Sequence, residues 1–89
     1  MKQIEVEISN ELGLHARAAA RFVHVASQFK SRVTVVKDDY TVDGKSILGL
    51  LTLAARRGCW LNLHAEGEDA DAVLEELATL VRGGFGEGD

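Results

Sequence analysis

The sequence predicts an α+β fold in the form of a two-layer, open-faced sandwich, and two observations carry this prediction. Short segments in which polar and apolar residues alternate are typical of strands with one buried face, and longer segments with apolar residues every three or four positions are typical of helices. Their order along the chain is β-α-β-β-α-β-α. Because one face of each strand is polar, all helices are expected on one side of the sheet, and 89 residues suffice for one domain with a single core.

The first strand is expected over residues 3–8, where isoleucine and valine alternate with glutamine and glutamate. After a polar loop that ends at Gly13, apolar residues recur at helical spacing. The residues expected on the buried face of this helix are Ala16, Ala19, Ala20, Val23 and Ala26, broadened by Phe22 and Phe29.

The middle of the chain predicts a hairpin and a short helix. Residues 32–37 are rich in β-branched side chains, two aspartates suit a tight turn, and residues 40–42 form a short third strand. Ser46 stands at the N-cap position of a helix over residues 47–54, which Gly58 is expected to end.

The last third predicts a strand over residues 60–65 and a helix over residues 70–81, which has the clearest apolar periodicity in the chain. Asp69 is placed to cap this helix, and two glycines end it. Residues 84–89 are expected to form a flexible tail of the one domain, which spans residues 1–89.

The net charge of −4 is unevenly distributed. Residues 1–67 hold nine basic and seven acidic side chains, whereas residues 68–89 hold one basic and seven acidic side chains. This pattern argues against a nucleic-acid-binding module, which carries a clustered basic face. The cationic set in the middle of the chain consists of Arg17, Arg21, Lys45, Arg56 and Arg57, and the sequence does not establish that they share a face.

Other classes of protein are disfavoured as well. No segment approaches the ~20 apolar residues needed to cross a bilayer, and the N-terminus has no apolar signal stretch. Cys59 is the single cysteine, which excludes a disulfide framework and a thiolate metal cluster. The histidines show no recurring metal-ligand spacing. We therefore expect a soluble, cytoplasmic protein without membrane insertion, metal or cofactor.

The segment Gly13-Leu14-His15-Ala16-Arg17 carries the strongest functional signal. It places an imidazole where a loop becomes a helix, beside unpaired backbone amides and the positive end of the helix dipole. A phosphoryl group on His15 would meet donors that are already in place, and Arg17 is close enough to reach it. Taken alone, the pattern leaves open a plain polar residue at a helix start. For His24, inside the helix, and His64, on the polar side of a strand, positions without function are the better interpretation.

Two separate motifs resemble the HPr family, the phosphocarriers of the bacterial phosphoenolpyruvate:sugar phosphotransferase system. The segment Gly13-Leu14-His15-Ala16-Arg17 is similar to the active-site signature of the family, and Asp43-Gly44-Lys45-Ser46-Ile47-Leu48-Gly49 is similar to its second signature. The segment Ala65-Glu66-Gly67-Glu68-Asp69 extends the resemblance to the last helix, so that it covers nearly the whole chain.

The resemblance implies a carrier that is phosphorylated on histidine and is not itself an enzyme. His15 would accept a phosphoryl group on Nδ1 from phosphorylated enzyme I and pass it to the A component of a sugar permease. The guanidinium of Arg17 would pair with the phosphate, and the amides of Ala16 and Arg17 would lie near it. The resemblance also implies a four-stranded antiparallel sheet of order 1-4-2-3 with three helices on one face.

The chain departs from the family at two positions near His15. The family usually has proline directly after the arginine, where this chain has Ala18. Proline fixes φ and lacks an amide that would be unpaired in the first helical turn, so we expect Ala18 to leave the geometry around His15 less rigid. Leu12 replaces a residue that is often polar and makes the lip of the site more apolar.

Ser46 has two interpretations. Serine is a preferred N-cap and needs no further role to explain its position. The resemblance implies a second role as a regulatory site for an ATP-dependent HPr kinase/phosphorylase. A phosphate would add about −1.5 to −2 charge at the helix start, where it should weaken docking of acidic partners rather than the fold.

A surface patch beside His15 is expected to bind enzyme I and the A components. The patch is expected to be small, because a carrier must release each partner quickly. The expected members are Ala20, Ile47, Leu48 and Leu51 at the centre, with Arg17, Arg21 and Lys45 around them. For Leu51, ordinary core packing is the alternative. We expect the chain to act as a monomer.

Other functions stay open to different degrees. A nitrogen-related branch of the family uses the same histidine chemistry for regulation instead of sugar uptake, and Ala18 is compatible with it. A purely regulatory domain on this scaffold would be favoured by loss of the histidine, which is present. An independent enzyme has no support, because the sequence offers no second nucleophile–base pair.

Overall fold

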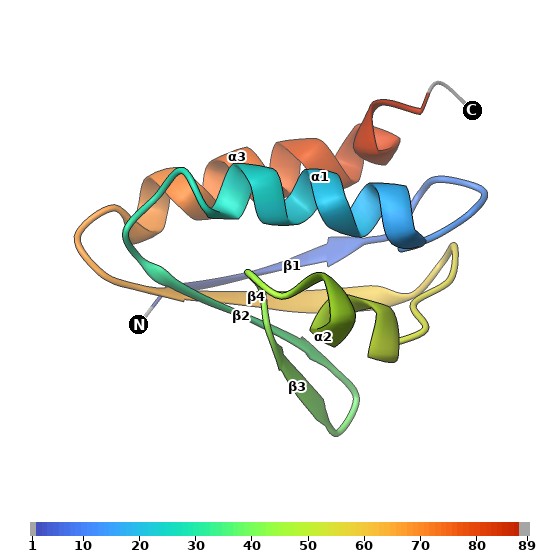
Figure 1. Ribbon diagram of the computed structural model, residues 1–89, viewed down its shortest axis with the longest axis horizontal. Coiled ribbons are helices and arrows are strands. Elements are labelled where there is room, and N and C mark those ends of the chain that lie inside the picture. Colours follow the sequence, from blue (N-terminus) through green and yellow to red (C-terminus); the bar gives the residue numbers. More distant parts are fainter. Residues whose placement is uncertain (1, 88–89) are drawn as a thin grey trace.

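The computed structural model describes residues 2–87 and has the predicted order of strands and α-helices, with one further short helix (Figure 1). The elements are β1 (Lys2–Glu7), α1 (Ala16–Ala26), β2 (Arg32–Lys37), β3 (Tyr40–Asp43), α2 (Ile47–Thr52), β4 (Trp60–Glu66), α3 (Ala70–Arg82) and a 3-10 helix, η1 (Gly84–Gly86). No helix within these residues has the length and apolar content that crossing a membrane requires.

The four strands form one antiparallel sheet in the order β1-β4-β2-β3, which confirms the expected topology. In its centre, Val6 of β1 lies opposite Leu61 of β4, and Leu63 of β4 lies opposite Val35 of β2. Figure 1 shows α1 and α3 side by side over the sheet, and α2 packs beside α1 and β3. The fold is therefore the predicted two-layer sandwich.

The core lies between the sheet and the helices. The strand residues that it buries are Val6, Val33, Val35, Leu61, Leu63 and Ala65. Each α-helix adds a fully buried side chain, namely Phe22 from α1, Leu50 from α2 and Leu77 from α3. Burying a side chain of this size stabilises the fold by about 1.5–3 kcal/mol relative to leaving it in water. Because apolar residues alternate with polar ones along the strands, they lie on one face of the sheet, and the helices cover that face.

The buried face of α1 differs from the prediction. Its buried residues are Ala18, Ala19, Phe22 and Ala26. Ala16 and Ala20, which were expected on that face, are exposed. Phe22 offers far more apolar area than any alanine, so the gain from burying it determines the rotation of the helix.

The end of α2 also differs from the prediction. The helix ends at Thr52 and not at residue 54, because Ala54 has a φ of 49° in the left-handed region. This turn allows both neighbours of Ala54 to enter the core, Leu53 with 2% and Ala55 with 4% of their surface exposed. Gly58 does not end the helix and lies in the turn before β4.

Asp69 precedes α3, but its side chain does not cap the helix. The carboxylate accepts hydrogen bonds from the backbone amides of Lys30 and Ser31, both at 2.9 Å, and from the hydroxyl of Ser31. The hydroxyl of Ser31 and the amide of Lys30 hold the pKa of Asp69 below its usual value. Asp69 therefore occupies the predicted N-cap position of α3, but its carboxylate ties the α1–β2 loop to the start of the helix and makes no capping hydrogen bond.

The expected flexible tail is wrong for residues 84–87. Gly84–Gly86 form η1, and Phe85 is only 1% exposed. Three successive residues have positive φ, namely Gly84 (67°), Phe85 (57°) and Gly86 (74°), and they turn the chain back toward α1. Glycine adopts this conformation freely, and the ~1–2 kcal/mol that it costs Phe85 is offset by burial of the ring. Residues 88–89 of the expected tail lie outside the described residues.

Candidate functional site

The loop before α1 is held in place by the loop that follows α2. The amide of Leu14 donates to the carbonyl oxygen of Ala55 at 2.9 Å, and the Leu14 side chain is buried. Gly13 has a φ of 67°, and a Cβ at this position would lie 2.5 Å from the same oxygen. Glycine is therefore required at Gly13 for both conformation and space, and the two loops together fix the backbone that carries His15.

His15 is the N-cap residue of α1. Its backbone is extended, with φ −82° and ψ 179°, and its carbonyl accepts the first helical hydrogen bond from the amide of Ala19 at 2.8 Å. On the side-chain end, Nδ1 accepts from the amide of Arg17 at 3.3 Å. The ring is 28% exposed. One ring nitrogen therefore lies at the amino end of a helix, where backbone donors and the helix dipole favour negative charge.

The other ring nitrogen contacts a residue that sequence analysis did not single out. Nε2 of His15 is hydrogen-bonded to Oε2 of Glu87, which η1 brings into the site. The Nδ2 amide of Asn10 donates to Oε1 of Glu87 and to the carbonyl of Gly13, both at 2.8 Å. The one signal in the sequence is Phe85, an aromatic residue between two glycines, which argues against a solvated tail.

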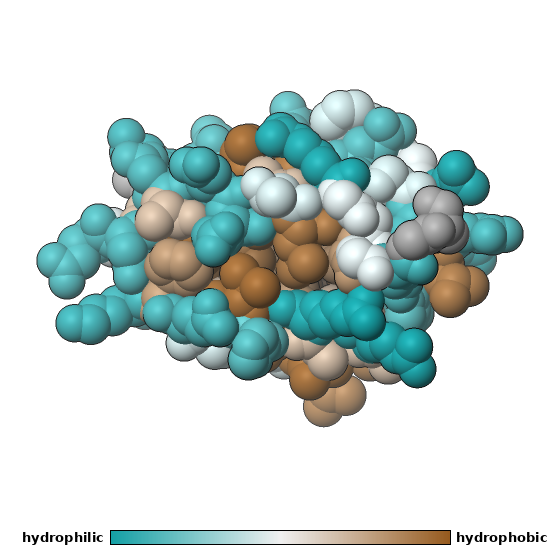
Figure 2. Space-filling model, turned by 90° about the horizontal axis from the view of Figure 1, so that it is seen from above, coloured by the Kyte–Doolittle hydropathy of each residue, from teal (hydrophilic) through white to brown (hydrophobic). Residues whose placement is uncertain are grey.

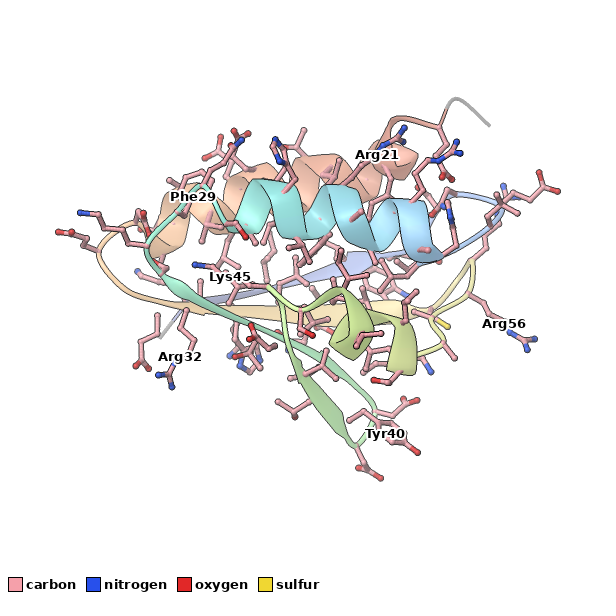
Figure 3. The ribbon with its side chains drawn as sticks, in the orientation of Figure 1. Arg21, Phe29, Arg32, Tyr40, Lys45 and Arg56 are labelled. Atoms are coloured by element: carbon pink, nitrogen blue, oxygen red, sulfur yellow. The ribbon has the colours of Figure 1, made fainter. Side chains whose placement is uncertain are left out.

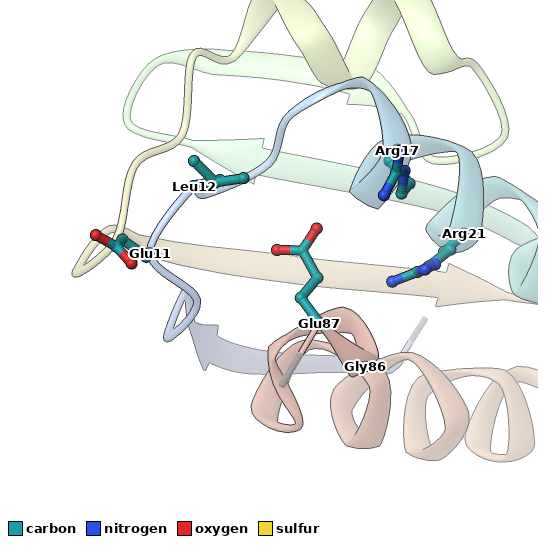
Figure 4. A pocket seen from close by; sticks show the side chains of 6 residues that line it. All are labelled: Glu11, Leu12, Arg17, Arg21, Gly86 and Glu87. Carbon is teal, nitrogen blue, oxygen red and sulfur yellow. The ribbon is translucent and has the colours of Figure 1, made fainter. Parts of the chain in front are cut away.

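A cavity of about 500 Å³ opens beside His15, lined by Glu11, Leu12, Arg17, Arg21, Gly86 and Glu87. Figure 4 shows Arg17 and Arg21 extending from α1 toward the carboxylate of Glu87, while Leu12 lies on the opposite side. Nη1 of Arg21 also donates to the carbonyl of Phe85 at 2.5 Å. The cavity thus combines two guanidinium groups with the amino end of α1. Leu12 is 71% exposed, as expected for an apolar lip.

Ser46 is the N-cap of α2, as predicted, with its Oγ accepting from the amide of Gly49 at 3.0 Å. Ile47 and Leu48 follow it and are 41% and 77% exposed. Ala20 of α1, the helix beside α2, is exposed as well, whereas Leu51 is half-buried against the core. Figure 2 shows apolar side chains surrounded by hydrophilic ones on the helix side of the molecule.

The cationic set does not share one face. Nζ of Lys45 donates to the carbonyl of Phe29 at 2.8 Å, beyond the last turn of α1, and therefore lies away from His15 (Figure 3). Arg56 extends from the loop between α2 and β4 in a different direction. Of the predicted residues, the structure brings Arg17 and Arg21 to the site around His15, and Lys45 is not part of that group.

The remaining candidate residues lie apart from His15. His24 is exposed on α1 and contacts Gln28 at 3.3 Å, and His64 is half-buried in β4. Cys59 carries a free thiol that accepts from the amide of Arg56. Within residues 2–87 no three histidine, cysteine or acidic side chains come together in a group that could hold a metal ion.

Comparison with known proteins agrees with this geometry. The family model described as "PTS HPr component phosphorylation site" matches residues 2–83. The chain is 48% identical over 89 residues to phosphocarrier protein HPr of Neisseria meningitidis serogroup A, with all of both chains covered. It is 41% identical over 83 residues to phosphocarrier protein NPr of Shewanella violacea, covering 93% of this chain and 91% of that protein.

A solved structure is similar to a comparable extent. The crystal structure of HPr-C-His from Thermoanaerobacter tengcongensis matches with a TM-score of 0.94 and 44% identity, covering 98% of each chain. The agreement therefore extends over the fold as well as over the sequence. The chain belongs to the HPr family, the phosphocarriers of the phosphotransferase system that are transiently phosphorylated on histidine.

Proposed function

We propose that His15 is the histidine that carries the phosphoryl group, on Nδ1. The observation that supports this best is the position of Nδ1 at the amino end of α1, where it faces the amide of Arg17. In this proposal phosphorylated enzyme I is the donor, and the A component of a sugar permease is the acceptor. The carrier acts as a monomer in the cytoplasm.

The same surroundings would stabilise the product. When Nδ1 forms its bond to phosphorus, the amide of Arg17 is released and can donate to a phosphate oxygen instead. The amide of Ala16, also in the first helical turn, points in the same general direction. The guanidinium of Arg17 can add a charge-assisted hydrogen bond, and a helix start contributes about 0.3–1 kcal/mol for a nearby negative charge.

Partner docking would use the exposed apolar residues beside this site. Ile47 and Leu48 project from α2, and Ala20 is exposed on the neighbouring turn of α1. Arg17 and Arg21 would flank them and attract acidic partner surfaces. A patch of so few residues is suited to a small, transient interface, from which enzyme I and the A component can dissociate quickly.

The acceptor assignment is tested by incubating the protein with phosphoenolpyruvate and enzyme I and measuring the phosphate bound per chain. The wild type should take up one acid-labile, base-stable phosphate, and His15→Ala should take up none. His24→Ala is the matched control because its ring is exposed on the same helix, and it should be phosphorylated normally. Phosphorylation of His15→Ala would show that another residue is the acceptor.

We also propose that Ser46 is a regulatory phosphorylation site for an HPr kinase/phosphorylase. Its support is the position of Ser46 at the start of α2, directly before the exposed residues Ile47 and Leu48, which belong to the docking surface proposed above. A negative charge there would repel an acidic partner while still accepting the hydrogen bond from Gly49.

Two variants separate charge from capping at Ser46. Ser46→Asp should slow phosphoryl transfer from enzyme I and leave the thermal midpoint nearly unchanged, because aspartate caps as well as serine does. Ser46→Ala should lower the free energy of unfolding by about 1 kcal/mol and leave transfer unchanged. Equal transfer rates for wild type and Ser46→Asp would leave Ser46 with a capping role alone.

A regulatory role without sugar uptake is the second candidate, supported by the 41% identity to the phosphocarrier named NPr. The two roles differ in the acceptor. Phosphorylated protein that passes its phosphate to the A component of a sugar permease supports the transport role, whereas phosphorylated protein that transfers to none of those components supports the regulatory one.

A further inference from the structure

Glu87 contacts the reacting imidazole on the side away from the helix, and no part of the proposed transfer yet uses it. We propose that Glu87 is a positioning residue that holds the proton on Nε2 of His15 and so presents the lone pair of Nδ1 to phosphorus. This inference rests on the proposed role of His15 as acceptor. Its evidence is the hydrogen bond between Nε2 and Oε2 together with the contacts that fix Glu87 itself.

Asn10 holds the carboxylate of Glu87 directly, and two further contacts hold the segment that carries it. Asn10, which is 1% exposed, donates to Oε1 at 2.8 Å, and the same amide group donates to the carbonyl of Gly13. Arg21 donates to the carbonyl of Phe85, two residues before Glu87. The buried ring of Phe85 anchors the segment in the core. The side chain of Glu87 is only 13% exposed, so it is a fixed part of the site.

The two contacts of the ring select one protonation state. The amide of Arg17 is a donor, so Nδ1 must offer a lone pair to accept from it. The carboxylate of Glu87 is an acceptor, so Nε2 must carry hydrogen. Only the neutral tautomer with hydrogen on Nε2 satisfies both. The other neutral tautomer would place two donors against each other at Nδ1 and two acceptors at Nε2.

This tautomer is the one that the chemistry requires. The lone pair of Nδ1 forms a bond to phosphorus while the bond from phosphorus to its donor atom breaks, and the donor keeps that electron pair. The proton on Nε2 stays in place, so the phosphorylated ring carries a positive charge that faces the carboxylate of Glu87. In the onward transfer a nucleophile of the acceptor forms the new bond to phosphorus while the Nδ1–P bond breaks. The electron pair of that bond returns to Nδ1, and the ring leaves as a neutral imidazole.

The first test observes the proton on Nε2 directly in the unphosphorylated protein. In 15N-labelled wild type we expect a downfield NMR resonance, correlated with Nε2 of His15, because the hydrogen bond to the carboxylate slows exchange with water. Glu87→Ala should lose this resonance to exchange. Glu87→Gln keeps an acceptor of the same size and should retain the resonance, shifted upfield because its acceptor is uncharged. Glu5→Gln, on the exposed side of β1, is the control.

The second test measures transfer from enzyme I. Glu87→Ala should lower kcat roughly tenfold or more with little change in KM, because a hydrogen bond to a charged group is lost at the reacting ring. Glu87→Gln should fall between Glu87→Ala and wild type, and Glu5→Gln should equal wild type. This ranking of the transfer rates is expected if Glu87 positions the ring. Thermal unfolding of each variant checks that a lower rate does not come from a loss of folding.

Two results would overturn the inference. One is an Nε2 proton that stays visible in Glu87→Ala, and the other is wild-type transfer by that variant. These outcomes are distinct from failure of the acceptor assignment, because the resonance is measured without enzyme I. Phosphorylation of His15→Ala would refute the acceptor role even if the resonance behaves as described.

Discussion

At the scale of single residues, Asp69 shows how one carboxylate can join distant parts of the chain. It accepts hydrogen bonds from two residues of the α1–β2 loop, Lys30 and Ser31, while standing at the start of α3. Those hydrogen bonds favour the charged form and hold the pKa of Asp69 below its ordinary value of 3.8. Folding therefore favours the ionised state of this side chain.

The consequence is a contribution to stability that depends on pH. Because the folded pKa is lowered, the stabilisation by Asp69 is complete above the ordinary carboxyl range and is lost as the pH falls through the folded pKa. Asp69→Asn should unfold at a lower temperature than wild type near pH 7, and the difference should shrink below pH 3.8. Thermal unfolding of both proteins from neutral to strongly acidic pH measures this.

The control is Asp71→Asn, which removes an exposed carboxylate from the first turn of the same helix. Its unfolding temperature should differ little from that of wild type over the same pH range. If Asp69→Asn and Asp71→Asn behaved alike, the hydrogen bonds from Lys30 and Ser31 would not be the source of the stabilisation.

Residue-level predictions from the sequence succeeded where the signal was local. Ser46 could be recognised as an N-cap because capping depends on neighbours within one turn, and His15 could be placed at a helix start for the same reason. The contact between His15 and Glu87 joins residues 72 positions apart. The amine of Lys45 likewise donates a hydrogen bond to the backbone carbonyl of Phe29, a contact that no local pattern indicates. Such contacts follow from the tertiary fold, which local spacing does not contain.

At the scale of elements, the start of α1 determines how firmly His15 is held. The helical hydrogen bonds begin with the amide of Ala19, which donates to the carbonyl of His15. The amide of Ala18 precedes this first bond and is not needed for the helical ladder. A proline at position 18 would therefore fix φ without breaking a helical hydrogen bond.

Ala18→Pro should raise the free energy of unfolding by about 0.4–1 kcal/mol, because proline reduces the conformational freedom of the unfolded chain. Ala19→Pro is the matched control, since both alanines are fully buried and adjacent. It removes the hydrogen bond to His15 and should cost about 3 kcal/mol or more. Urea unfolding measures both, and destabilisation of equal size in the two variants would contradict the assignment of Ala18 to the unpaired turn.

The existence and order of the elements could be predicted because the strands alternate and α3 has a clear apolar repeat. The rotation of α1 could not, since five alanines in its sequence leave several faces nearly equal in hydrophobicity. The end of α2 was also missed, because Ala54 adopts a left-handed conformation that alanine rarely takes. In both elements the burial of larger neighbours, Phe22 and Leu53, outweighed local preference.

At the scale of the whole molecule, the strand order gives the sheet a protected centre. β4 is hydrogen-bonded to β1 on one side and to β2 on the other, whereas β3 pairs only with β2. The side chains of Leu61 and Leu63 lie in the core above this centre. η1 is held by far fewer hydrogen bonds than β4, because two hydrogen bonds of 3.1–3.2 Å close its short turn.

Native-state hydrogen exchange should follow this gradient. The amides of Leu61 and Leu63 should exchange only through global unfolding, so their protection should fall with urea as the global stability does. The amides of Gly86 and Glu87 should exchange through local opening, at rates that low concentrations of urea hardly change. Protection of Gly86 and Glu87 equal to that of β4 would show that η1 opens only together with the sheet.

The docking of η1 against the start of α1 has a practical consequence for anyone who prepares this protein. A purification handle attached shortly after Glu87 would begin next to the imidazole and could distort measured transfer rates. The start of β1 lies at the opposite end of the molecule (Figure 1). Fusion partners, fluorophores and immobilisation chemistry therefore belong on the amino-terminal side.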